Sequence, residues 1–141
     1  MVVLTLVIVV LRYVFQIGSV LLQEAVMYMH ACLFMIGCAY TLQVDQHVRV
    51  DVFYSKMSLR QRLKVNIFGH VFLLLPVCIF IAWVSFDYVI NAWRIMEGSG
   101  ETGGLHAVYI LKSLILIFAS LMILQGISQL IVLLRQLKEH P

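Results

Sequence analysis

Residues 43–64, QVDQHVRVDVFYSKMSLRQRLK, form a polar and basic segment between long apolar stretches. The segment holds five of the ten Lys and Arg residues of the chain: Arg49, Lys56, Arg60, Arg62 and Lys64. Loops of membrane proteins that are rich in Lys and Arg stay on the cytoplasmic side. A compact basic segment between two hydrophobic stretches therefore predicts a cytoplasmic loop in an integral membrane protein.

The overall composition indicates the same class of protein. The chain is 62% hydrophobic and 12% charged, with a mean hydropathy of +0.99, whereas a soluble domain carries about 25% charged residues. Its 141 residues suffice for three or four spans of about 20 residues each. The net charge of +3 comes from one loop and the tail, which indicates topogenic charge and not a nucleic-acid-binding surface.

We expect an all-α integral membrane protein with four transmembrane helices, forming a single membrane domain over residues 1–141. The apolar stretches place the spans at about 1–22, 25–42, 65–86 and 107–134, with a cytoplasmic basic loop at 43–64 and a periplasmic loop at 87–106. The first span is predicted to be shortened at its N-terminus, because Arg12 in the middle of a full span would cost a few kcal/mol. Arg12 then lies near the outer end of that span.

Two local signals refine the third span and the loop after it. Ser58 and Gln61 have the spacing of a capping box, which predicts a helix from Leu59 onward. Pro76 lacks a backbone N–H and should kink that helix. The sequence EGSGETGG at 97–104 predicts a flexible loop.

The distribution of charge orients the four predicted helices. The middle loop and the tail together carry seven Lys and Arg residues, whereas the opposite side carries three: Arg12, Arg94 and Lys112. This bias places both termini in the cytoplasm. Aromatic residues gather where the outer interface is then expected, at Trp83, Tyr88, Trp93 and Tyr109.

The histidines raise the possibility of a haem-holding membrane anchor of a redox complex. Axial ligation needs two histidines at similar depth on facing helices. His30 is predicted about two turns into the second span from the outside, and His70 near the inner start of the third. This difference in depth argues against a haem shared by the two histidines.

The cysteines (Cys32, Cys38 and Cys78) form no C-x-x-C pair and are interpreted as small core residues.

The ionisable residues of the spans lie near their predicted ends. Glu24, Asp87 and Lys112 would belong either to an ion pathway or to interfacial anchoring, with Lys112 paired to Asp87. The second, third and fourth spans have no acidic or basic residue near their middle, which favours anchoring. Gln125 and Gln129, with Ser128 between them, form a polar stripe expected to face protein, either within the bundle or on a partner.

The order of several short motifs resembles the small membrane subunit of TRAP (tripartite ATP-independent periplasmic) transporters. The relevant stretches are LRYVF at 11–15, QE at 23–24, HVRVD at 47–51 and the pattern GGLxxVxxLKS at 103–113. Where the family usually has glycine before the histidine and a first glutamate in the second helix, this chain has Gln46 and Gln23. The similarity covers essentially the whole chain.

The resemblance implies a non-enzymatic small permease subunit in a bacterial inner membrane. It implies a large permease subunit that carries the sodium and substrate sites, a periplasmic solute-binding protein as a further partner, and no cofactor on this chain. Arg12, Glu24, His47, Arg49 and Asp51 match the motif positions of the family and, with Lys112, are candidates for structural or subunit contacts. Asp51 would pair with Arg49 or with a basic group of a partner.

Overall fold

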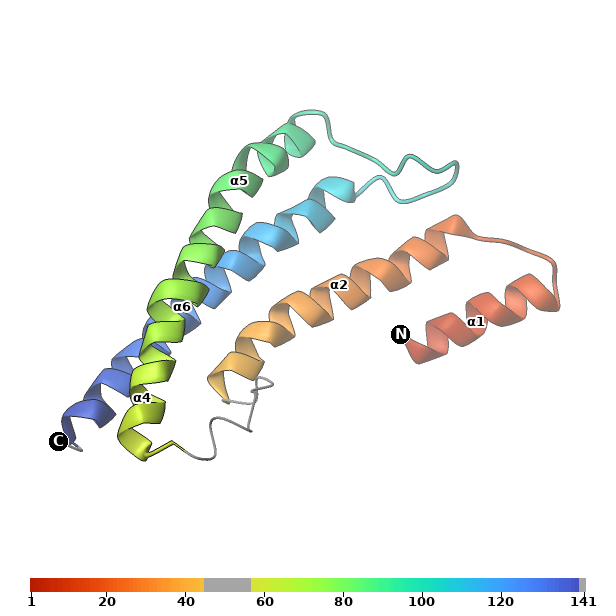
Figure 1. Ribbon diagram of the computed structural model, residues 1–141. Helices are drawn as coiled ribbons and strands as arrows, with labels where there is room; N and C mark the ends of the chain where they lie inside the picture. The colour runs from red at the N-terminus through yellow and green to blue at the C-terminus, as the bar shows by residue number, and fades with distance from the viewer. Residues whose placement is uncertain (45–56, 140–141) are drawn as a thin grey trace.

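The computed structural model describes residues 1–44 and 57–139, and this part of the chain is helical without strands. The helices are α1 (Val2–Tyr13), α2 (Val20–Gln43), α4 (Leu59–Phe68), the π-helical segment η1 (Gly69–Leu74), α5 (Leu75–Arg94) and α6 (Val108–Glu139). Figure 1 shows α1 beside α2, with α6 in contact with both α2 and α5.

Serine caps begin two of the helices. The Ser19 hydroxyl accepts a hydrogen bond from the Leu22 N–H at the start of α2. At α4, the Ser58 hydroxyl accepts from the Gln61 N–H, and the Ser58 N–H donates to the Gln61 side chain at 3.0 Å. Each cap satisfies N–H groups that have no partner within their own helix. The predicted capping box and the helix start at Leu59 are therefore confirmed.

The α4, η1 and α5 segments form one continuous helical rod, Leu59–Arg94, of 36 residues. Pro76 lies at the second position of α5 and cannot donate a backbone hydrogen bond. The turn before it is wider than an α-helix, and the Leu75 N–H donates to the His70 carbonyl five residues earlier. The structure thus accommodates Pro76 with a π-helical turn.

Helix α6 is the centre of the packing. It lies against α5 and α2 along much of its length, and also contacts α4 and η1. Small side chains allow close packing here: Ala92 of α5 and Ala119 of α6 are almost completely buried. Gly126 of α6 likewise allows η1 to pack closely, since a Cβ at this position would lie 2.5 Å from a Leu74 methyl.

Three helices, α2, the Leu59–Arg94 rod and α6, are long and apolar enough to cross a membrane. Their apolar side chains face outward over most of their length, as Leu33, Phe80 and Trp83 illustrate with exposed fractions of 62%, 66% and 81%. Helix α1 is equally apolar but has 12 residues, or about 18 Å, which is shorter than the roughly 30 Å hydrocarbon layer. These features are consistent with a membrane protein.

Two helix boundaries differ from the predicted spans. The stretch expected as one span over 1–22 is divided, because α1 ends at Tyr13 and α2 begins at Val20. Arg12 consequently lies in the last turn of α1, near a helix end as expected. The loop expected at 87–106 is shorter than predicted, because α5 continues for about two turns beyond Asp87 to Arg94.

Candidate functional site

Most of the polar contacts between distant described segments lie where α2 begins, α5 ends and α6 begins. The α5–α6 loop, residues 95–107, bends back at this end of the molecule toward the first turns of α2 (Figure 1). Met96 turns the chain out of α5 with a φ of 46°. The loop is thereby brought over two of the predicted residues, Glu24 and Lys112.

The Glu24 carboxylate holds the α5–α6 loop through both of its oxygens. Oε1 accepts a hydrogen bond from the Ser99 hydroxyl, and Oε2 accepts one from the Leu105 N–H at 2.6 Å. Hydrogen bonds to a carboxylate are stronger than those between neutral groups. One side chain of α2 thus fixes two points of a loop that lies 75 to 81 residues further along the chain.

Main-chain hydrogen bonds close the same loop on itself. The Ser99 N–H donates to the Leu105 carbonyl at 3.0 Å, and the Gly104 N–H donates to the Glu101 carbonyl at 3.1 Å. The Ser99 hydroxyl also accepts from the Glu101 N–H at 3.2 Å. The glycine-rich sequence predicts flexibility, but the structure shows a closed turn around Ser99.

Glycine is required sterically at two positions of this turn. A Cβ on Gly104 would collide with the Ser99 hydroxyl and lie 2.8 Å from Glu24 Oε1. A Cβ on Gly98 would collide with the His106 ring. At Gly104 the closed turn has no space for a side chain, and at Gly98 a side chain would displace the exposed His106 ring.

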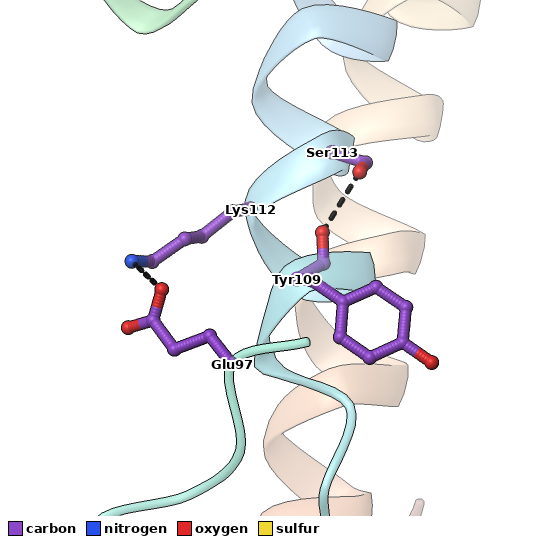
Figure 2. Close-up of polar contacts among 4 residues, drawn as sticks. All are labelled: Glu97, Tyr109, Lys112 and Ser113. Carbon is purple, nitrogen blue, oxygen red and sulfur yellow. Dashed lines mark hydrogen bonds and ion pairs between the residues drawn. The ribbon is translucent and has the colours of Figure 1, made fainter. Parts of the chain in front are cut away.

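Lys112, in the second turn of α6, forms an ion pair with Glu97 at 2.5 Å (Figure 2). Its ammonium group also lies 3.9 Å from the centre of the Tyr88 ring on α5, a cation–π geometry. The predicted pairing with Asp87 is wrong. Because α5 runs past Asp87 and then turns, it is Glu97 that returns to α6, and the Asp87 side chain is exposed.

An aromatic pair lies beside this ion pair. The Trp93 and Tyr109 rings meet edge to face at 4.7 Å, joining the end of α5 to the start of α6. The Trp93 indole N–H donates to the Ser113 hydroxyl at 2.8 Å, and that hydroxyl donates to the Tyr109 carbonyl (Figure 2). Three of the four aromatics predicted for the outer interface, Tyr88, Trp93 and Tyr109, therefore join α5 to α6.

Arg12 takes no part in these contacts. Its side chain is exposed and lines an open depression of about 620 Å³ between the end of α1 and the start of α2, together with Gln16, Ser19 and Gln23. Within residues 1–44 and 57–139, no ion pair or hydrogen bond of the Arg12 side chain is found.

The opposite end of α2 is held by the predicted polar stripe of α6. The Gln129 amide donates to the Gln43 carbonyl at 3.0 Å and approaches the Leu42 carbonyl at 3.4 Å. These carbonyls lie in the last turn of α2, where they have no partner within the helix. For Gln129, the expectation that the stripe faces protein is confirmed, and the protein it faces is α2.

The three predicted residues of the basic segment, His47, Arg49 and Asp51, lie outside the described residues, so their role stays a prediction.

The two histidines considered as haem ligands lie on different helices and contact different residues. His30 of α2 is exposed beside Phe34, and His70 of η1 bonds the Asn66 carbonyl through Nδ1. In the described part of the chain, no group of three His, Cys, Asp or Glu side chains is arranged to hold a metal ion.

Sequence reasoning found Glu24 and Lys112 but not the residues that they contact. Glu97 and Ser99 lie in a segment interpreted as a flexible loop, and the Leu105 contribution is a backbone N–H that every non-proline residue carries. The sequence did offer one signal for these contacts, because the hydrogen-bonding residues Glu97 and Ser99 stand on either side of Gly98.

Chemically, this arrangement fixes helix ends and one loop. It offers no Asp, Glu, Lys or Arg side chain in the middle portions of the three long helices, since residues 25–43, 65–86 and 113–134 contain none. Transport pathways for charged solutes depend on such groups.

Comparison with known proteins identifies one family. The family model for "Tripartite ATP-independent periplasmic transporters, DctQ component" matches residues 1–136. No curated protein and no solved structure matches the chain.

Proposed function

The chain belongs to the DctQ family of tripartite ATP-independent periplasmic transporter components, and we propose that it serves as the static scaffold of a sodium-coupled permease that imports an organic acid. As a member of this family it is the small permease subunit and a transporter component, not an enzyme. In the proposal it holds the large permease subunit, which binds sodium and solute and moves during transport. The complex resides in a bacterial inner membrane and receives solute from a periplasmic binding protein.

The observation that carries this proposal is the combination of apolar helices with an absence of charge in their middle portions. Residues 25–43, 65–86 and 113–134 carry no Asp, Glu, Lys or Arg, so this chain lacks the charged groups that bind an ion or an anionic solute in a membrane. Its helices nevertheless expose large apolar side chains along most of their length. A chain with this surface and no site of its own fits a supporting subunit.

The topology proposed with this function has four membrane-embedded segments and both termini in the cytoplasm. The basic residues Arg60, Arg62 and Lys64 lie at the start of α4, and Arg135 and Lys138 lie at the end of α6. These two helix ends lie at the same end of the molecule (Figure 1). The positive-inside bias then places the α5–α6 loop in the periplasm.

Co-purification with the large permease subunit tests the proposal. A tagged form of this chain, co-expressed with the large permease subunit of the same transporter, should elute as one stable complex in detergent. Reconstituted with the binding protein, that complex should take up organic acid only when a sodium gradient is present. Elution of this chain alone as a stable homo-oligomer would refute the scaffold role, and uptake without sodium would refute the coupling.

A further inference from the structure

We infer that Glu24 is a positioning residue that shapes the α5–α6 loop into the surface on which the soluble binding protein docks. This inference rests on the proposed function for the identity of the partner. The shape of the loop itself is independent of that proposal, since it follows from contacts within this chain.

Several contacts of the α5–α6 loop converge on the Glu24 carboxylate. Glu24 accepts from the Ser99 hydroxyl and from the Leu105 N–H, and so holds both sides of the turn. The Ser99 N–H and the Leu105 carbonyl are also bonded to each other. Loss of the Glu24 carboxylate removes the only contacts described between this turn and α2, apart from van der Waals contacts.

The apex of the α5–α6 loop is polar and exposed. Residues 100–103 are all exposed, and their sequence, Gly-Glu-Thr-Gly, contains no apolar side chain larger than a methyl group. Such a segment suits an aqueous surface and not the lipid or an apolar face of a membrane partner. The partner expected here is a water-soluble protein that meets Glu101 and the exposed backbone with hydrogen-bond donors and positive charge.

An ordered loop lowers the free-energy cost of association with a partner. A glycine-rich loop without fixed contacts would lose conformational entropy when a partner ordered it. The Glu24 contacts order this loop before any partner arrives. Removing them should weaken docking, while the transport cycle of the assembled, docked transporter should proceed at its normal rate.

The test uses the reconstituted complex of this chain with its large subunit, in four variants. Glu24→Gln and Ser99→Ala each remove part of the contact, and the double variant combines them. Asp87→Asn is the matched control, because it removes one exposed carboxylate from the same end of the molecule without touching the loop. Hydrogen exchange of a peptide covering residues 97–107 reports the loop, and sodium-driven uptake at varied binding-protein concentration reports docking.

Glu24→Gln should accelerate exchange of the Leu105 amide by about tenfold, the effect of losing one strong hydrogen bond. The binding-protein concentration for half-maximal uptake should rise by a similar factor, with an unchanged maximal rate. Ser99→Ala should act in the same direction. The double variant should exceed either single variant by less than the sum of the two effects, because they share the Ser99–Glu24 bond, whereas the Leu105–Glu24 and Glu101–Ser99 bonds are lost separately. Asp87→Asn should match the parent in both measurements.

Three results would overturn the inference. Unchanged exchange in Glu24→Gln would show that the carboxylate does not hold the loop. Faster exchange with an unchanged half-maximal concentration would show that the loop is not the docking surface. Loss of co-elution with the large subunit would assign the loop to assembly instead. If the parent complex shows no uptake at all, it is the proposed function that fails, and the exchange measurement still decides the role of Glu24 in shaping the loop.

Discussion

Replacing Gly104 with alanine should open the α5–α6 loop, because the added methyl has no space in the closed turn. Its Cβ would collide with the Ser99 hydroxyl, lie 2.6 Å from the Ser99 Cβ and lie 2.8 Å from Glu24 Oε1. A flexible side-chain end could move away from one contact, but these atoms belong to two side chains that already bond each other. Overpacking of this kind costs about 1–3 kcal/mol.

The loop can escape this cost by opening, since an open turn no longer brings Ser99 and Glu24 against the methyl group. The free energy of opening should therefore fall by about 1–3 kcal/mol, which corresponds to an acceleration of roughly 5- to 150-fold in hydrogen exchange at the Leu105 amide. The exchange rate cannot exceed that of an unprotected amide, and it reaches this limit when the turn is open in most molecules. Mass spectrometry of the detergent-purified protein, with a peptide covering residues 97–107, measures this directly.

Gly100→Ala is the matched control, because it makes the same chemical change in the same loop where a Cβ meets nothing within 4 Å. Its φ lies outside the left-handed region, so alanine there should leave exchange unchanged or slow it by reducing the entropy of the open loop. Equal exchange in Gly104→Ala and Gly100→Ala would refute the closed turn, and with it the steric argument for glycine at 104.

Three further changes test the remaining contacts. Ser58→Ala should remove the N-cap of α4 at a cost of about 0.5–2 kcal/mol, seen as faster exchange in the first turn of that helix; unchanged exchange would contradict the observed cap. Gln129→Leu should lower the free energy of unfolding by about 0.5–1.5 kcal/mol, measured by steric trapping in bicelles, whereas Gln136→Leu, at an exposed position of the same helix, should have little effect; equal losses would show that the α2 carbonyls are not the cause. A short bifunctional thiol reagent should join Cys38 to Cys78, which contact one core cluster from two helices, and failure to crosslink under conditions that label both would contradict this packing.

The sequence predicted the helices well because their signals are local or periodic. Apolar length indicated the long helices, and the spacing of Ser58 and Gln61 located the start of α4. The position of Arg12 near a helix end followed from the free energy of burying its charge. Each of these inferences depends on neighbours in the chain and needs no knowledge of tertiary contacts.

The contacts of the α5–α6 loop were not predictable in the same way. The partner of Lys112 depends on where α5 ends. Because α5 continues for about two turns beyond Asp87, the acidic residue that reaches Lys112 is Glu97 and not Asp87. Glu24 is recognisable as an unusual acidic residue, but its partners lie more than 70 residues away, and one of them is a backbone N–H. Glycine content predicted freedom of the backbone, whereas at Gly98 and Gly104 the glycines permit close packing.

The described polar contacts hold α2 against α6 at both ends and leave the middle to apolar packing. At one end Glu24 bonds the loop that leads into α6, and at the other Gln129 bonds the last carbonyls of α2. A small cluster around Leu42, Cys78 and Met122 lies next to the Gln129 contacts, while most apolar side chains of the helices face outward. Two helices fixed at both ends cannot tilt relative to each other without breaking one set of bonds. Such a pair has the constant geometry that the proposed scaffold role requires, and its outward apolar faces are available to lipid and to the proposed large subunit.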